Sequence, residues 1–250
     1  MDDASGSPAN LTRLIAIMAR LRDPVGGCEW DVAQRWETIA PYTIEEAYEV
    51  ADAIERGVPA EVRDELGDLL LQVVFQSRIA EENGLFTFDE VAAAIADKME
   101  RRHPHIFGDA AERPDWEAMK AEERAVGGAL DGVARGLPAL QRAEKLQRRA
   151  ARVGFDWPDE SGPRAKIDEE LAEVDAAPTN ELEGEIGDLL FSVVNWARHR
   201  GIDAEQALRT ANAKFERRFA AMEDAAGTGF DALPLDAKEA LWSAVKRSGG

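Results

Sequence analysis

The sequence predicts an all-α protein that contains two copies of a four-helix domain. Apolar residues recur at spacings of three and four along most of the chain, as they do on the buried face of an amphipathic helix. No segment shows sustained alternation of β-branched and polar residues, so we expect no sheet. In addition, Glu65-Leu-Gly-Asp68-Leu-Leu recurs as Glu185-Ile-Gly-Asp188-Leu-Leu. This match indicates an internal duplication.

Four helices are predicted in the first half of the chain. They cover about residues 11–21, 43–56, 60–82 and 88–102. The second begins at Thr43, after Pro41, and stops at Gly57, because proline and glycine interrupt a helical pattern. The third ends at Asn83-Gly84, a pair typical of a helix C-terminus.

The helical pattern resumes after Pro138 and again gives four helices. Apolar residues keep helical spacing over about residues 140–146, 167–174, 182–194 and 208–222. A further amphipathic helix is expected over residues 235–247. The second half therefore repeats the first and adds a terminal helix.

Glycine and proline accumulate between His103 and Pro138, around one short helical stretch near Trp116–Arg124. Such a composition is typical of a connector between domains. We therefore expect an N-terminal domain over residues 1–108, a linker over 109–137 and a C-terminal domain over 138–250.

Composition limits the classes of partner. The chain has 30 basic and 49 acidic residues, a formal net charge of −19, which repels phosphate backbones and anionic membranes at long range. We therefore expect neither nucleic acid nor a membrane as a partner. No apolar run is long enough to cross a bilayer, and no secretory signal pattern is present. Because a lone cysteine, Cys28, fits a reducing compartment, we expect the protein to be cytoplasmic.

Acidic pairs at a spacing of three residues occur on consecutive helices of each half. This spacing places both carboxylates on one helix face, and two antiparallel helices would bring four of them together. Four ionised carboxylates repel one another unless a hard divalent cation with oxygen ligands, of which Mg²⁺ is the best candidate, lies among them. The pairs are Glu46/Glu49 with Glu65/Asp68, and Glu170/Glu173 with Glu185/Asp188.

A single acidic pair proves little, because many such pairs on a helix are simply solvated. Glu46 also fits a second role, since Thr43-Ile-Glu-Glu46 is a capping-box pattern in which the glutamate bonds the cap amide. Cap and metal ligand are left open for this residue. Glu65 and Asp68, however, interrupt an apolar stretch, and burying carboxylates near a core is costly without a partner. Because the arrangement occurs twice, metal binding is favoured.

Basic pairs follow the acidic ones at matching places, Lys98 with Arg102 and Lys214 with Arg218. Alone they would more often belong to a solvated surface. Beside a carboxylate–Mg²⁺ cluster, ammonium and guanidinium groups point to a polyanion such as a phosphate chain.

These residues together resemble the MazG family. The resemblance rests on both acidic motifs, on Arg102-His-Pro-His-Ile-Phe-Gly108, and on Arg142-Ala-Glu-Lys-Leu-Gln with Val153-Gly-Phe-Asp-Trp157. It covers the chain from about Leu11 to Arg247. The early family pattern Cys-Pro-Trp-Asp-x-x-Gln-Thr-His is altered here, since Cys28-Glu-Trp-Asp31 lacks the proline and the Thr-His pair is missing.

The resemblance implies tandem all-α MazG domains, a homodimer, and Mg²⁺-dependent, broad-specificity cleavage of nucleoside triphosphates to monophosphates and pyrophosphate. It implies that the C-terminal domain hydrolyses. The metal ligands, which are also the catalytic groups, would be Glu170, Glu173, Glu185 and Asp188; Lys214 and Arg218 would contact the phosphates, and Trp242 would lie near the nucleotide.

Two alternative functions remain open from the sequence. One is an all-α pyrophosphohydrolase restricted to dUTP or phosphoribosyl-ATP, since no residue of the sequence is recognised as reading the base. The other is a non-catalytic helical interaction protein with solvated acidic clusters. The chain has neither a P-loop nor a nucleophile elbow, so a covalent intermediate is not expected.

Overall fold

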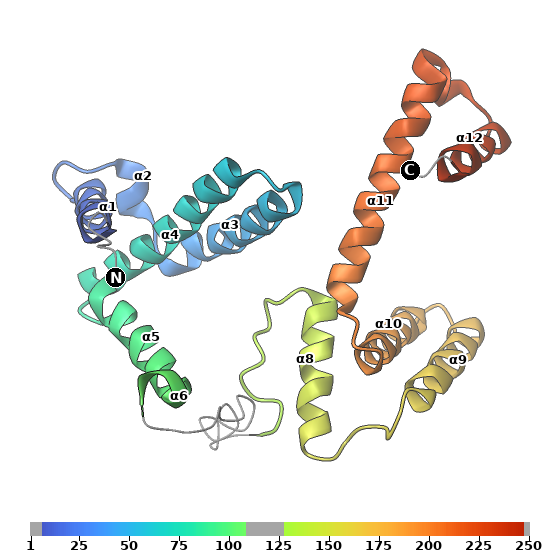
Figure 1. Cartoon of the computed structure of the whole chain (residues 1–250), viewed down its shortest axis with the longest axis horizontal. Coiled ribbons are helices and arrows are strands. Elements are labelled where there is room, and N and C mark those ends of the chain that lie inside the picture. Colours follow the sequence, from blue (N-terminus) through green and yellow to red (C-terminus); the bar gives the residue numbers. More distant parts are fainter. Residues whose placement is uncertain (1–6, 109–127, 248–250) are drawn as a thin grey trace. The chain divides into compact units, whose positions relative to one another are not determined.

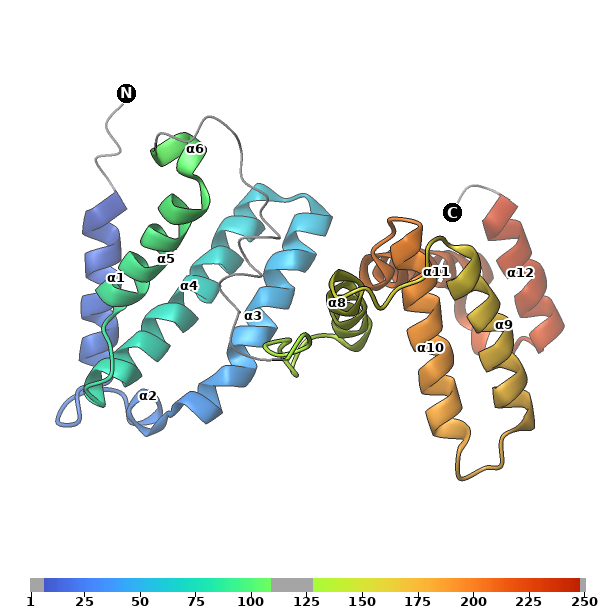
Figure 2. The same cartoon turned by 90° about the horizontal axis from the view of Figure 1, so that it is seen from below.

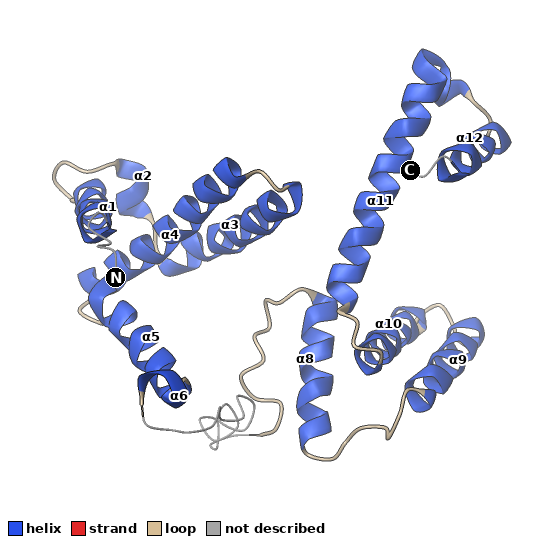
Figure 3. Ribbon diagram, viewed as in Figure 1, coloured by secondary structure: helices blue, strands red, loops and turns tan. Residues whose placement is uncertain are grey.

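A computed structural model of the chain describes residues 7–108 and 128–247. Within these ranges the protein consists of helices and connecting loops and has no strand, as Figure 3 shows, which confirms the all-α prediction. The chain divides into two compact units, residues 1–124 and 125–250. Most of the predicted linker, including the helical stretch near Trp116–Arg124, lies outside the described residues.

Unit 1 is built on a helical hairpin. Helices α3 and α4 pack side by side in antiparallel directions, and α1 packs on α4 (Figures 1 and 2). Helix α5 packs on α4 as well, and α6 on α5. The bounds are α1 Ser7–Leu21, α2 Glu29–Ala33, α3 Trp36–Arg56, α4 Pro59–Glu82, α5 Phe88–Arg102 and α6 Pro104–Phe107.

Helix α3 begins earlier than the sequence predicts, at Trp36 rather than Thr43, so Pro41 lies inside the helix. Proline in the second turn removes one intrahelical hydrogen bond, a cost that local and tertiary contacts offset. The Arg35 amide donates to Thr38 Oγ1 at 2.8 Å, and Trp36 Nε1 donates to the Gln76 carbonyl of α4 at 3.1 Å. The first bond stabilises the start of α3, and the second anchors the extra turns to α4.

The core of unit 1 lies where α1, α3 and α4 meet. It consists of Met18, Ile39, Val74, Phe75 and Ile79. The Phe75 ring also meets Trp30 edge-on, with 6.4 Å between centroids, and has the guanidinium of Arg22 at 5.3 Å from its centroid. Aliphatic and aromatic side chains therefore fill the space between these three helices.

Unit 2 repeats the hairpin with α9 and α10, which pack side by side, while α8 packs on α10 (Figure 2). Helix α11 contacts α8 and α10 and carries the terminal helix α12. The bounds are α8 Ala139–Arg152, α9 Ser161–Ala176, α10 Leu182–His199, α11 Ala204–Ala226, the 3₁₀ helix η1 Gly227–Ala232, and α12 Leu235–Arg247. The helices predicted for the second half are confirmed, and the terminal helix has the predicted bounds.

Both hairpins leave apolar side chains exposed. Leu66, Leu70 and Val73 of α4 are 38–49% exposed, and Ile186, Leu190 and Val193 of α10 are 39–51% exposed. The equivalent apolar row is therefore exposed in both units.

Among the described helices, none combines the length and the apolar character that a bilayer-crossing segment needs.

Candidate active site

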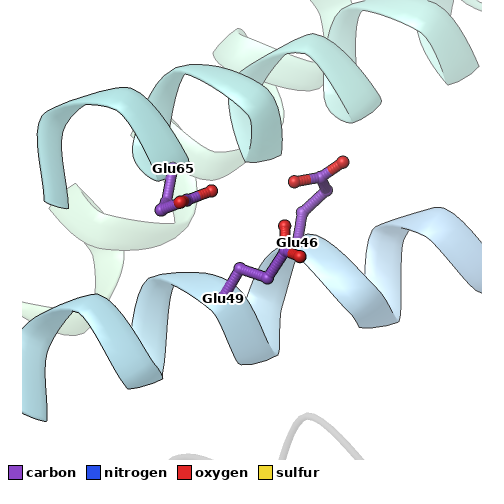
Figure 4. Close-up of side chains that lie close together, drawn as sticks. All are labelled: Glu46, Glu49 and Glu65. Atoms are coloured by element: carbon purple, nitrogen blue, oxygen red, sulfur yellow. The ribbon is translucent and has the colours of Figure 1, made fainter. Parts of the chain in front are cut away.

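The α3–α4 hairpin brings three of the predicted carboxylates together. Figure 4 shows Glu46 and Glu49 projecting from α3 toward Glu65 of α4. One carboxylate oxygen from each lies within 4.8 Å of the others. Spacing of three residues on α3 and the antiparallel packing of α4 together produce this convergence.

The α9–α10 hairpin forms the equivalent cluster from Glu170, Glu173 and Glu185, whose carboxylate oxygens also lie within 4.8 Å of one another. Glu170 is buried, whereas Glu173 is exposed. Only 11 residues separate Glu173 from Glu185, against 15 between Glu49 and Glu65, yet the carboxylates still converge. The loop itself is not shortened, since residues 177–181 join α9 to α10 whereas only residues 57–58 join α3 to α4.

The fourth predicted carboxylate of each set, Asp68 or Asp188, is exposed and lies outside the close trio. Asp68 is nevertheless near enough to Glu46 to affect its ionisation, since its charge raises the pKa of that group. Asp188 lines a cavity together with Glu170. Both aspartates thus lie next to the trios that they were predicted to complete.

Mutual repulsion marks both clusters. Burial and the charges of Asp68 and Glu49 raise the pKa of Glu46 above its usual value. Desolvation and the charges of Glu170, Glu169 and Glu185 raise the pKa of Glu173, against the lowering effect of Lys166. Because the charged forms disfavour one another, a cation among the carboxylates would be stabilised.

The structure rejects the capping role that the sequence left open for Glu46. Thr43 lies inside α3, where its Oγ1 accepts a hydrogen bond from Gln76 Nε2 at 2.6 Å. A residue inside the helix cannot be the N-cap, so the capping-box prediction is wrong. The physical reason is the earlier helix start at Trp36, which the contacts with α4 stabilise.

Lys166 is a charged neighbour of the second cluster that the sequence analysis missed. Its Nζ lies 2.7 Å from a carboxylate oxygen of Glu170 and 2.8 Å from one of Glu169. These contacts raise the pKa of Lys166 above its usual value. The signal was available, since Lys166 precedes Glu170 by four residues and therefore lies on the same helix face.

The basic residues predicted to contact phosphates lie on other helices. Arg218 of α11 has its guanidinium 5.8 Å from the ring centroid of Trp242, and the ring of Phe215 lies 5.4 Å from the same indole. This group therefore lies where α11 meets α12, and Figure 1 shows α12 well away from the α9–α10 hairpin. Lys214 precedes Arg218 on the same helix.

In unit 1, Lys98 and Arg102 lie in the last turns of α5. This helix starts beside the C-terminal end of α4 and packs on α4 (Figures 1 and 2). In both units, therefore, the basic pair lies on a different helix from the carboxylate trio.

The donor set of both clusters suits a hard divalent cation. Carboxylate oxygens are the ligands that Mg²⁺ and related ions prefer, and three of them already converge without rearrangement of the helices. The residues present therefore fit such an ion in each unit.

Comparisons with known proteins agree with this arrangement. The profile of the MazG nucleotide pyrophosphohydrolase domain matches residues 34–107 and 165–221, which contain the α3–α4 hairpin and all but the first turn of the α9–α10 hairpin. The chain is 49% identical to the nucleoside triphosphate pyrophosphohydrolase of Escherichia coli K12 over 95% of this chain and 97% of that protein. It is 43% identical to the nucleoside triphosphate pyrophosphohydrolase/pyrophosphatase MazG of Thermotoga maritima, over 93% of this chain and 94% of the relative. A nucleoside triphosphate pyrophosphohydrolase of Mycobacterium tuberculosis is 38% identical over 58% of this chain and 46% of its own length.

Proposed function

The chain belongs to the MazG nucleotide pyrophosphohydrolase family, and on that premise we propose that it hydrolyses nucleoside triphosphates to nucleoside monophosphates and pyrophosphate in an Mg²⁺-dependent reaction. The convergence of Glu170, Glu173 and Glu185 on the α9–α10 hairpin is the observation that carries the assignment of the site. The family assignment opposes the alternative of a non-catalytic interaction protein.

The residues that would hold the cation are Glu170, Glu173, Glu185 and Asp188. When bound, a divalent cation neutralises phosphate charge and makes a coordinated water more acidic. The carboxylates would hold that cation where the phosphate chain binds, and a carboxylate oxygen that is not a ligand would accept the proton of the attacking water. Water adds to one phosphorus as the bond between the α and β phosphoryl groups breaks, which yields the monophosphate and pyrophosphate.

Unit 1 offers a second cation site of the same type, at Glu46, Glu49 and Glu65 with Asp68 beside them. We place turnover in unit 2 because the carboxylates there adjoin a cavity, with Glu170 and Asp188 in its wall. Broad base specificity and a cytoplasmic location are parts of the same proposal. They are supported by the relatives' general names and by the single cysteine.

A homodimer would complete this site. The uncovered apolar rows on α4 and α10 need a partner surface, because large exposed apolar patches mark interfaces. A second copy is the natural partner in a symmetric oligomer. We further propose that α11 and α12 of one copy deliver Lys214, Arg218 and Trp242 to the carboxylates of the other, since within one chain α12 lies away from the α9–α10 hairpin (Figure 1).

A nucleotide panel tests the activity directly. The chain is incubated with Mg²⁺ and each common ribo- and deoxyribonucleoside triphosphate, and pyrophosphate release is measured. We expect turnover of several bases; turnover of dUTP alone would favour the restricted alternative, and release of inorganic phosphate without pyrophosphate would contradict the proposal.

Substitution of one ligand tests the site. Glu185→Gln should lower pyrophosphate release by about a hundredfold or more, because a preorganised charged group is lost. The matched control is Glu183→Gln, an exposed carboxylate on the same helix and outside the trio. Both variants should keep the helical circular dichroism of the wild type. Normal turnover by Glu185→Gln would show that the site lies elsewhere.

A further inference from the structure

Unit 2 contains a cavity of about 440 Å³ that continues from the carboxylate cluster. Its lining includes the charged residues Glu170, Asp188 and Lys166 and the aromatic residues Phe155, Trp157 and Phe191. The volume lies in the range of small-molecule sites, which are mostly apolar with a few polar groups. A nucleotide likewise combines charged groups, in its phosphate chain, with a flat aromatic base.

Gln147 is the polar group of this cavity whose hydrogen bonding is incomplete. It is 6% exposed and is the one buried residue of α8. Its Nε2 donates to the Phe191 carbonyl of α10 at 2.8 Å, and since a carbonyl can only accept, this bond fixes the orientation of the amide. Its Oε1 is buried and has no hydrogen-bond partner. A buried acceptor of this kind is costly unless a ligand supplies a donor.

The equivalent region of unit 1 is filled. The repeat that pairs Glu65 with Glu185 also pairs Phe75 with Asn195. Aligning Leu11-Thr-Arg13 with Leu140-Gln-Arg142 places Met18 opposite Gln147. Met18 and Phe75 are buried in the core of unit 1, whereas Gln147 and Asn195 line the cavity of unit 2. Polar residues thus replace core residues where the cavity occurs.

Two contacts hold the aromatic wall of the cavity. Arg198 of α10 donates to both carboxylate oxygens of Asp156, at 2.9 and 2.6 Å, which fixes the loop that carries Phe155 and Trp157. The indole of Trp157 lies against Gly162, where a Cβ atom would come within 2.0 Å of Trp157 Cδ1. The absence of a side chain at residue 162 therefore lets the indole pack against the start of α9.

We propose that this cavity binds the nucleobase of the substrate and that Gln147 Oε1 accepts a hydrogen bond from an N–H group of the base. The inference rests on the proposed function and adds a specificity-determining residue to it. The aromatic side chains supply flat surfaces on which any base can stack. Each common base carries an N–H group, either in the ring or in an exocyclic amino group. A single hydrogen-bond acceptor can therefore bind any of them without discriminating strongly between them.

A substrate that lacks the donor tests the contact. Purine riboside 5′-triphosphate is ATP without the exocyclic amino group, and its base has no N–H. With wild-type protein and Mg²⁺, we expect kcat/KM for pyrophosphate release to be about tenfold lower for this analogue than for ATP, because the Gln147 acceptor stays unpaired. Gln147→Met introduces the residue found at the equivalent position of unit 1. In this variant, kcat/KM for ATP should exceed that for the analogue by no more than about twofold.

Gln72→Leu is the matched control, since Gln72 of unit 1 also has a buried Oε1 without a partner. This variant should keep the wild-type preference for ATP. The ratio of two substrates on one protein does not depend on the folded fraction, and the wild-type comparison alone needs no variant. Equal kcat/KM values for ATP and the analogue in the wild type, or an unchanged ratio in Gln147→Met, would overturn the inference. A wild-type protein that releases no pyrophosphate from either would instead overturn the proposed function.

Discussion

The side chains that form the candidate site differ in how well the sequence predicts them. The acidic pairs were found from their spacing, because helical geometry alone places such residues on one face. Gln147 ends the motif Arg142-Ala-Glu-Lys-Leu-Gln, but nothing in that motif predicted its burial, since a glutamine on a helix rich in charged residues is expected on the surface. Its burial comes from the packing of α8 on α10, which no local pattern encodes. Site residues could therefore be predicted where their position depends on helical spacing, but not where it depends on tertiary contacts.

Asp156 is the residue whose ionisation links this site to stability. Hydrogen bonds from Arg198, and one contact with His199, lower its pKa from 3.8 to about 2 although partial burial opposes this. A carboxyl whose pKa is lower in the folded state contributes stability above its unfolded pKa. The contribution, about 2 kcal/mol, is therefore present above about pH 4 and is lost as the pH falls toward 2.

Asp156→Asn removes this contribution. We expect the free energy of unfolding at pH 7 to fall by about 2 kcal/mol, and the difference from the wild type to shrink between about pH 4 and pH 2. Urea denaturation followed by circular dichroism at pH 7 and pH 3 checks both parts. Asp175→Asn, an exposed carboxylate on α9, is the control and should change stability little. A pH-independent difference for Asp156→Asn would contradict the assignment.

At the scale of elements, most helices were predicted because their apolar period and their stop signals agree. Residues 88–102 and 235–247 are helical with the predicted bounds. The exception is α3, where Pro41 predicted a boundary that contacts with α4 override. The short helix α2 was not predicted, because five residues carry too little periodic pattern.

The turn between α1 and α2 depends on Gly27. The Cys28 amide donates to the Leu21 carbonyl at 2.7 Å, and the Gly27 amide donates to the Asp23 carbonyl at 2.8 Å. A Cβ atom at residue 27 would lie 2.2 Å from the Leu21 oxygen and 2.6 Å from the Asp23 oxygen. Both are backbone atoms, so an added methyl group must displace the turn itself.

Gly27→Ala should therefore destabilise the chain by about 1–3 kcal/mol. Gly26→Ala is the matched control, because a Cβ atom there would meet only the Arg20 side chain, at 3.6 Å. Chemical denaturation of the two variants measures the difference. If both variants were as stable as the wild type, the close approach at Gly27 would not constrain the turn.

At the scale of the whole molecule, the duplicated sequence produces two helical hairpins that are each incomplete. The apolar rows of α4 and α10 stay exposed in the single chain, although the sequence pattern alone predicted that both would be buried. Periodicity identifies which face of a helix is apolar, but not which chain covers it. The sequence therefore predicted the hairpins and two sets of four carboxylates, of which three converge in each unit. That the apolar rows stay uncovered was seen only in the structure.

Mixing two impaired variants, assayed at a triphosphate concentration well below the wild-type KM, tests whether two copies share a site. Glu185→Gln alters the carboxylate trio, and Arg218→Ala removes a guanidinium that lies beside Trp242. Arg218→Ala should weaken triphosphate binding by about 1–3 kcal/mol, the range for a charge-assisted contact. If α11 of one copy serves the trio of the other, a mixed dimer carries one site with both defects and one with neither. Mixing the two proteins after mild dissociation should then raise pyrophosphate release well above the sum of the separate activities.

The matched control is Arg217→Ala, which alters a neighbouring exposed arginine and should be nearly as active as the wild type when assayed alone. Activity that only equals the sum, from proteins shown by sedimentation to have exchanged subunits, would mean that each copy builds its site from its own chain.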